Sequence, residues 1–402
     1  NTDTPALAAD ARLPDNLLLA GLKHPKCRGV LAVTNDEQSN LAIAIAVRLL
    51  NPDIPVIARA RTEAVTANMA SFGTDHIINP FERFAEHLAL AVSAPERFRL
   101  IELLTSLPES PIPEPHRPPR GHWILCGYGS FGHAVAHHLR DTGITLTIID
   151  PAAKDADKQF IGDGTEAATL RQAGIEEAAG IVAGSDNDVN NLAIAVTASE
   201  IKPELFVVAR QNHAANSALF AAYDADFTVL PSRIVAQECI AILTAPLLAR
   251  FLERLHSLDE NHCRQLVERL HGECGGLTPA VWDIRINAAE APAAWQALMH
   301  ERPIRLGEIL PDGADRSRRQ PAVPLLVERG SDCHLLPDDE FLLQAGDQLL
   351  MASTLPAQRD LELTLKNANE LDYVLTGHEN SGSLLARLLA PKRSAIAHAG
   401  DA

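Results

Sequence analysis

The chain lacks several features that would assign it to a class at once. Its 402 residues contain no uninterrupted apolar run of about 18 residues, the length that a membrane-spanning helix needs. The longest candidate, Cys239–Leu252, is too short. Six cysteines form no CxxC pair, which indicates reduced intracellular thiols. Only 35 basic residues stand against 52 acidic ones, and the net charge of −17 argues against a nucleic-acid partner.

Common catalytic and metal-binding motifs are also missing. We find no nucleophile elbow, P-loop or zinc-protease helix. His133 and His137 share one helix face and could bind a metal, but no third ligand is evident, and a plain surface helix explains them as well. A second group matches no zinc spacing: His262, Cys263, His271 and Cys274. The metal ligands, if any, are therefore unknown.

What is present is an internal repeat. Apolar residues make up 46% of the chain and charged residues 22%, which is ordinary for globular domains. Asn40–Ala44 is identical to Asn191–Ala195, and Pro95 corresponds to Pro246 at the same spacing of 151 residues. Each copy alternates short apolar strands with helices, a pattern typical of parallel sheets covered by helices. Each copy then ends in a helical stretch that its proline should break.

The second copy begins with secondary-structure elements that the first copy lacks. A strand at 123–126, a glycine loop, a helix at about 133–141 and a strand at 144–149 precede its repeated part. We therefore expect the chain to begin inside a domain, with the first copy missing at least one strand, loop, helix and second strand.

The fold we expect is α/β, with tandem Rossmann-like doubly wound parallel sheets, the first incomplete in this chain. After residue 257 the pattern changes to short strands at 282–287, 324–328, 339–343 and 348–351, typical of a small α+β subdomain. Six prolines between 108 and 119 indicate a semi-rigid spacer. The expected divisions are 1–107 (partial first Rossmann domain), 108–120 (linker), 121–257 (second Rossmann domain), 258–366 (C-terminal subdomain) and 367–402 (tail, with a helix at 383–389).

A dinucleotide-binding fingerprint opens the second copy. Gly127-x-Gly129-x-x-Gly132 lies between a strand and a helix, and Asp150 ends the next strand. The glycines allow a tight turn, close approach of a pyrophosphate, and close packing of helix on strand. Asp150 would accept hydrogen bonds from a ribose and repel a 2′-phosphate, which favours NAD(H) or an adenine nucleotide (ADP, ATP or AMP) over NADP(H). A glycine turn used only for packing is the alternative. The whole loop enters the predicted site: Gly127, Tyr128, Gly129, Ser130, Phe131 and Gly132.

Further candidates follow later strands of the same copy, where the ligand edge of an open α/β sheet lies. Each has a plain structural alternative. Asp163, Gly164 and Thr165 could bind adenine or ribose, or form a polar turn. Arg210 could pair with a phosphate or with a structural carboxylate. A third group could face the ligand or cap the next helix: Ser185, Asp186 and Asn187.

Together, the glycine loop, Asp150, the 162–165 loop, the 185–188 turn and Ala209-Arg210 resemble the RCK domain, also called KTN or TrkA N-terminal domain. That domain regulates prokaryotic potassium channels and transporters. The resemblance implies that the proline-broken helices are dimerising crossover helices, and that 325–351 belongs to the small RCK C-terminal subdomain. It also implies a non-enzymatic regulator, in which divalent cations are often held between subunits by carboxylates that this sequence does not locate.

The arrangement looks closest to channels with two transmembrane helices and two RCK domains per chain. The resemblance then implies a homo-oligomer whose dimers assemble into a tetrameric gating ring below a pore domain encoded upstream. This region would lie at the cytoplasmic face of the inner membrane without entering it. In Trk subunits a C-terminal subdomain follows each Rossmann unit, whereas here the first copy runs directly into the linker.

Three alternatives remain. The first is a soluble regulatory subunit of a Trk or Kef-type transporter. The second is an NAD-dependent dehydrogenase, although the segment after Leu255 offers no acid/base arrangement for hydride transfer. The third is an assembly module whose nucleotide site is vestigial.

Overall fold

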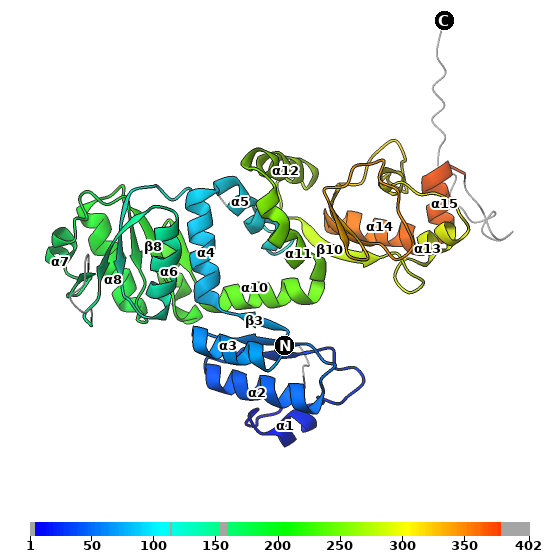
Figure 1. The fold of residues 1–402 in the computed structure, drawn as a ribbon. Coiled ribbons are helices and arrows are strands. Elements are labelled where there is room, and N and C mark those ends of the chain that lie inside the picture. The colour runs from blue at the N-terminus through cyan, green and yellow to red at the C-terminus, as the bar shows by residue number, and fades with distance from the viewer. Residues whose placement is uncertain (1–4, 113–114, 153–158, 379–402) are drawn as a thin grey trace, which may run out of the picture. The chain divides into compact units, whose positions relative to one another are not determined.

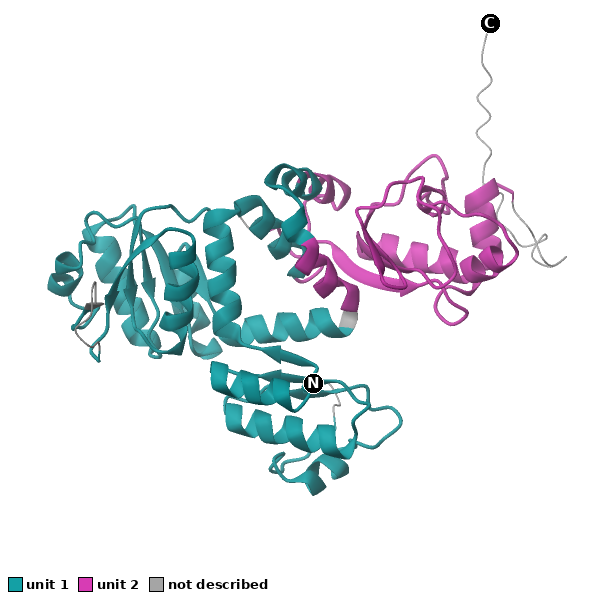
Figure 2. Ribbon diagram, viewed as in Figure 1, with its two compact units in different colours: residues 1–106, 113–243, 255–267 teal, residues 107–112, 244–254, 268–402 magenta. Residues whose placement is uncertain are grey.

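The computed structural model describes residues 5–112, 115–152 and 159–378. They divide into two compact units (Figure 2). Unit one holds residues 1–106, 113–243 and 255–267, and unit two holds 107–112, 244–254 and 268–402. The predicted α/β class with parallel sheets is confirmed. The helix predicted at 383–389 lies outside the described residues.

The first copy contains a three-stranded parallel sheet in the order β1-β2-β3. Helices α2 and α3 cover one face, where Val47 and Met69 are buried against Val56. The elements are α1 (Pro14–Leu19), β1 (Val30–Ala32), α2 (Glu37–Leu50), β2 (Val56–Arg59), α3 (Glu63–Ser71), β3 (His76–Ile78), α4 (Pro80–Ser93) and α5 (Pro95–Thr105).

The second copy has six parallel strands in the order β6-β5-β4-β7-β8-β9. The order reverses between β4 and β7, so their carboxyl ends flank the switch point at which open α/β sheets bind ligands. The elements are β4 (His122–Cys126), α6 (Ser130–Asp141), β5 (Thr145–Ile149), β6 (Gln159–Phe160), α7 (Ala167–Gln172), β7 (Gly180–Ala183), α8 (Asp188–Ile201), β8 (Phe206–Arg210), η1 (Ala214–Asn216), α9 (Ser217–Tyr223), β9 (Phe227–Val229) and α10 (Pro231–Thr244).

The two copies exchange their last helices within unit one. Helix α4 of the first copy lies beside α6 (Figure 1), and its Phe84 is buried in the core that includes Trp123 of the second sheet. In return, Cys239 of α10 packs with Ile57 and Ile78 of the first sheet. Each sheet is thus covered by a helix that belongs, by sequence, to the other copy.

Both helical stretches break where the sequence predicts. Helix α4 ends at Ser93, Ala94 leaves the helical region with φ −142° and ψ 71°, and α5 begins at Pro95. Helix α10 ends at Thr244, and α11 (Pro246–Arg254) begins at the second proline. No single helix among the described residues is both long and apolar enough for a membrane span, although the bent pair of Pro231–Leu243 and Pro246–Ser257 passes that length and composition test together.

Unit two contains an antiparallel sheet in the order β10-β13-β11-β12. Trp282, Leu349 and Leu361 belong to its core, and α11 packs on β10, β11 and β13. Helix α12 (Glu260–Glu273) begins in unit one and ends in unit two. The remaining elements are η2 (Leu255–Ser257), β10 (Ala280–Arg285), α13 (Pro292–Met299), η3 (Leu306–Ile309), β11 (Ala322–Arg329), β12 (Asp332–Leu335), β13 (Gln348–Ser353), α14 (Leu355–Lys366) and α15 (Ala368–Thr376).

One predicted strand is wrong. Residues 339–343 form no strand, and β12 at 332–335 takes the place beside β11 instead. Gly330, with φ +61°, allows a tight turn that pairs β11 with the residues immediately after it. Asp339 is held by other contacts: its carboxylate accepts hydrogen bonds from Arg319 at 2.6 and 2.7 Å, and its carbonyl accepts one from Gly307 N–H at 2.8 Å.

Ordered structure crosses two of the expected divisions. Within the proline-rich segment, Glu109 N–H donates to the carbonyl of Thr278 at 3.0 Å, and Thr278 N–H donates to the carbonyl of Ser110 at 2.9 Å. In the expected tail, α15 buries Leu371 and Val374 in the described part of unit two. Packing against distant residues therefore orders both segments.

Candidate functional site

The three glycines of the loop meet different surroundings. Gly127 has φ +95°, and a Cβ there would lie 3.0 Å from Ser185 N, so the turn requires glycine. A Cβ on Gly132 would lie 2.1 Å from the carbonyl oxygen of Gly127, whereas a Cβ on Gly129 would have no atom within 4 Å. The second glycine is therefore the place where another molecule can approach the backbone, next to the start of α6.

Asp150 is tied to this loop. Its carboxylate accepts hydrogen bonds from Tyr128 N–H at 2.6 Å and from Ala152 N–H at 2.7 Å. Each carboxylate oxygen keeps a further lone-pair position. The half-buried Asp150 thus fixes the first turn of the loop and can still accept hydrogen bonds from a ribose diol.

The loop after β6 supports both interpretations given above. Asp163 accepts a hydrogen bond from Thr165 N–H at 2.9 Å, as in a simple polar turn. A Cβ on Gly164 would lie 2.8 Å from Cys126 Sγ at the end of β4. This close approach places the 162–165 loop beside the glycine loop, at the carboxyl edge of the sheet.

The turn after β7 works as a helix cap. Asn187 accepts hydrogen bonds from Val189 N–H at 2.9 Å and Asn190 N–H at 3.1 Å, so it is the N-cap of α8. Asp186 is exposed. The predicted ligand role of this turn therefore rests on Ser185 and Asp186, at the mouth of the switch point.

Arg210 is buried, with only 8% of its surface exposed. Its Nη1 donates to the carbonyl of Gly184 at 3.2 Å, its Cζ lies 4.8 Å from the Phe81 ring centre and 5.2 Å from that of Phe131, and its Nε has no partner. Burial, with the positive charges of neighbouring arginines, lowers its pKa to about 10. Among the described residues no carboxylate pairs with it, so the structural salt bridge considered for Arg210 is absent there.

Sequence reasoning missed Asn191 and Phe81. Asn191 is fully buried: its Oδ1 accepts from Ser185 N–H and its Nδ2 donates to the carbonyl of Arg210, both within 2.8 Å. It therefore joins the ends of β7 and β8. Phe81 comes from the first copy, and only the tertiary exchange of α4 brings it to Arg210.

The first copy repeats this hydrogen-bond pattern. Asn40 Oδ1 accepts from Thr34 N–H at 2.9 Å, and its Nδ2 donates to the carbonyl of Arg59 at 2.9 Å. Asn40 and Asn191 begin the identical five-residue runs of the repeat, a signal that could have identified both.

The weaker metal candidates do not assemble. Among the residues that the structure describes, no three His, Cys, Asp or Glu side chains converge on a point that could hold a metal ion. His133 instead stacks on Tyr128, with ring centres 3.8 Å apart.

Parts of the chain are similar to known proteins. Residues 1–80 and 123–231 match the TrkA-N domain. The chain is 26% identical over 149 residues to potassium channel protein 1 of Methanocaldococcus jannaschii, covering 35% of this chain and 45% of that protein. It is 26% identical over 178 residues to a glutathione-regulated potassium-efflux system protein of Haemophilus influenzae, covering 40% and 28%. The chain spans less than half the length of either relative.

Solved structures resemble the chain more distantly. The GsuK RCK domain is 17% identical and covers 92% of this chain and 85% of its own, with a TM-score of 0.46. The GsuK channel bound to NAD is 17% identical and covers 89% and 70%, with a TM-score of 0.47. The AMP-bound Kef C-terminal domain of Shewanella denitrificans is 23% identical and covers 37% and 98%, with a TM-score of 0.29.

Proposed function

We propose that this chain is the nucleotide-binding regulatory region of a potassium channel, a proposal supported by the match of residues 1–80 and 123–231 to the TrkA-N domain. It binds NAD(H) or an adenine nucleotide and passes the binding energy to a potassium pore. Its role is regulatory and not catalytic.

One observation carries the proposal: the open backbone at Gly129, held beside Asp150 by the hydrogen bond from Tyr128 N–H. The residues present fit a dinucleotide. The amides at the start of α6 would hold phosphate oxygens, Asp150 would hold a ribose, and the 162–165 loop borders the same edge. Arg210 and the turn at Ser185 and Asp186 face the switch point, where a second phosphate or ribose group would lie.

Regulation follows from differential affinity. A nucleotide that binds one arrangement of the ring better than another shifts the equilibrium towards it, and a coupling of about 1–3 kcal/mol changes the equilibrium about 5–150-fold. In this proposal the chain acts as a homo-oligomer, its dimers forming a tetrameric ring at the cytoplasmic face of the membrane under a pore domain. The breaks at Pro95 and Pro246 are the points about which such a ring would flex.

Isothermal titration of the purified chain with NAD⁺, NADH, ADP, ATP, AMP and NADP⁺ tests the proposal. We expect micromolar binding of at least one adenine nucleotide and weaker binding of NADP⁺. Gly129→Trp fills the open space and should abolish binding with the fold intact. Gly272→Trp is the matched control, because Gly272 is an exposed glycine, also without neighbours within 4 Å, and lies in α12. Absence of binding by all six ligands would overturn the proposal.

A second candidate is the soluble regulatory subunit of a Trk or Kef-type transporter. It is favoured by the Haemophilus efflux relative, which covers 40% of this chain. The complete gene sequence separates the two: a pore filter upstream of the first copy supports the channel, and a start codon directly before that copy supports the subunit.

A further inference from the structure

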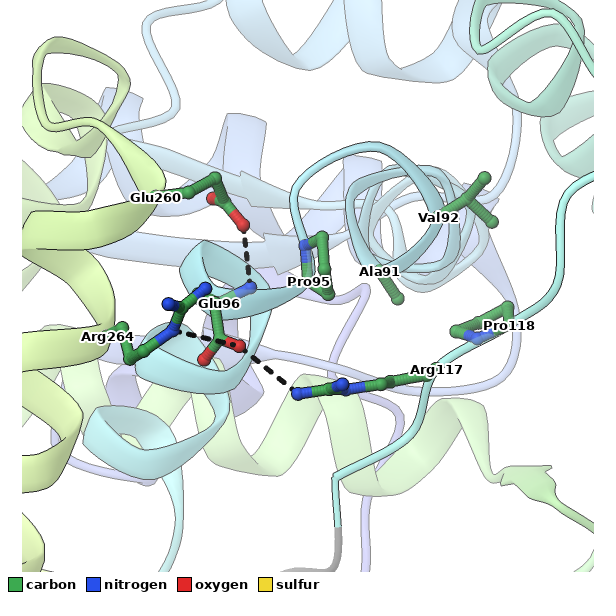
Figure 3. A pocket seen from close by; sticks show the side chains of 8 residues that line it. All are labelled: Ala91, Val92, Pro95, Glu96, Arg117, Pro118, Glu260 and Arg264. Atoms are coloured by element: carbon green, nitrogen blue, oxygen red, sulfur yellow. Dashed lines mark hydrogen bonds and ion pairs between the residues drawn. The ribbon is translucent and has the colours of Figure 1, made fainter.

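A cavity of about 530 Å³ lies in unit one where α5 begins, and none of its lining residues belongs to the candidate nucleotide site (Figure 3). Its volume falls in the range of small-molecule sites. Its walls come from the end of α4, the start of α5, the proline-rich segment and the first turns of α12. The lining residues are Ala91, Val92, Pro95, Glu96, Arg117, Pro118, Glu260 and Arg264.

Glu96 is a buried carboxylate in this wall that lacks a full set of partners. Its side chain is only 7% exposed. Oε1 lies 3.3 Å from Arg117 Nη2 and 3.6 Å from Arg264 Nε, while Oε2 is buried without a hydrogen-bond partner among the described residues. A buried acceptor without a hydrogen-bond partner is unfavourable, so the site favours a molecule that brings a strong donor.

The second carboxylate of the cavity is already engaged. Glu260 accepts a hydrogen bond from Glu96 N–H at 2.9 Å (Figure 3) and another from Arg97 N–H at 3.2 Å. It therefore caps the N-terminus of α5, a favourable place for a negative charge. Of the two acids, Glu96 alone has an oxygen free of hydrogen bonds.

The two arginines of the cavity have further N–H groups that can donate hydrogen bonds. Arg117 and Arg264 are 67% and 52% exposed and approach Glu96 from different elements. Each guanidinium has five N–H groups, most of which remain for another acceptor. Val92, Pro95 and Pro118 contribute apolar surface to the same cavity. Both glutamates would repel a purely anionic ligand, and both arginines would repel a purely cationic one.

We propose that this cavity binds a small zwitterion with an apolar body, of the α-amino acid class. The ammonium group is placed at Glu96, the carboxylate between Arg117 and Arg264, and the apolar side chain against Pro95 and Pro118. This site is distinct from the nucleotide site, since the two share no residue.

Titration of the purified chain with L-leucine, L-methionine and L-phenylalanine tests this assignment. L-leucine is compared with 4-methyl-2-oxopentanoate, which lacks the ammonium group, and with 3-methylbutylamine, which lacks the carboxylate. We expect at least one amino acid to bind, and each partial analogue to bind at least tenfold more weakly than L-leucine.

Variants locate the site. Arg117→Ala removes an exposed side chain and should weaken amino-acid binding at least tenfold, as should Glu96→Gln. If Glu96→Gln fails to fold, Arg117→Ala still decides. Arg171→Ala is the matched control and should change nothing, because Arg171 is a surface arginine of α7 that pairs with Glu176. Gly129→Trp should leave amino-acid binding intact. Absence of binding at 10 mM, equal binding of an analogue, or an unaffected Arg117→Ala variant would each overturn the proposal.

Discussion

At the scale of single residues, Glu102 on α5 makes stability depend on pH. Burial raises its pKa to about 7, although the positive charges of Arg233 and Arg99 act to lower it. Between the ordinary value of 4.5 and about 7 the folded chain binds more protons at this carboxyl than the unfolded chain, so stability falls as pH rises through this window. Above pH 7 we expect Glu102→Gln to be more stable than the parent by on the order of 1–2 kcal/mol. This figure is smaller than the full pKa shift implies, because the partly exposed carboxylate is screened by solvent.

Urea unfolding of both proteins from pH 4 to pH 8 measures this. The stability difference should shrink towards zero below pH 4.5, where the carboxyl is protonated in both states. Glu204→Gln, on an exposed loop, is the control and should follow the parent at every pH. A pH-independent difference for Glu102→Gln would show that its carboxyl does not titrate in this window.

The residues that sequence alone identified are those whose requirements are local. The spacing of Gly127, Gly129 and Gly132 predicts the loop because the tight turn is local: Gly127 has φ +95°, and a Cβ on Gly132 would lie 2.1 Å from the carbonyl oxygen of Gly127. Asn191 and Phe81 were missed because their roles depend on contacts between distant segments. The hydrogen bond that joins Asn191 to Arg210 appears only once β7 and β8 are side by side.

At the scale of elements, the exchanged helices α4 and α10 should be essential to unit one. Phe84 of α4 is 3% exposed and packs on the rings of Phe131 and Phe227 in the second copy. Phe84→Ala should lower the free energy of unfolding of unit one by about 3–5 kcal/mol, measured by denaturant unfolding. Leu219→Ala on α9, where the side chain is 56% exposed, should stay within about 0.5 kcal/mol of the parent. A small effect at Phe84 would mean that α4 does not pack on the second copy in solution.

The sequence largely predicted which segments form helices and which form strands. It did not predict which of these elements pack against one another. The two proline breaks fall where the sequence puts them, because proline acts on its own helix. The apolar face of α4 indicates burial but not against which sheet, so the exchange between copies stayed hidden. The prediction of a strand at 339–343 was wrong because apolar residues near a turn are compatible both with a strand and with a loop packed on η3.

At the scale of the whole molecule, the repeat made the α/β class predictable, and it also shows how the copies differ. Val182 on β7 is fully buried, whereas the equivalent Leu31 on β1 is 46% exposed. In the second sheet β7 pairs with β4 as well as β8, while β1 pairs with β2 alone among the described strands. Both copies share the hydrogen bonds of Asn40 and Asn191, while the described sheet of the first copy has three strands and that of the second has six.

The position of the candidate site predicts how the whole chain responds to a nucleotide. The candidate site lies entirely in unit one, so a ligand at one hundred times its dissociation constant should stabilise that unit by about 2.7 kcal/mol and leave unit two unchanged. Scanning calorimetry of the chain, with and without the nucleotide that binds best, should show one transition rising by several degrees while the other stays fixed. In Gly129→Trp neither transition should move. An equal shift of both transitions in the parent would mean that the two units unfold together, and a shift that persists in Gly129→Trp would place the nucleotide elsewhere.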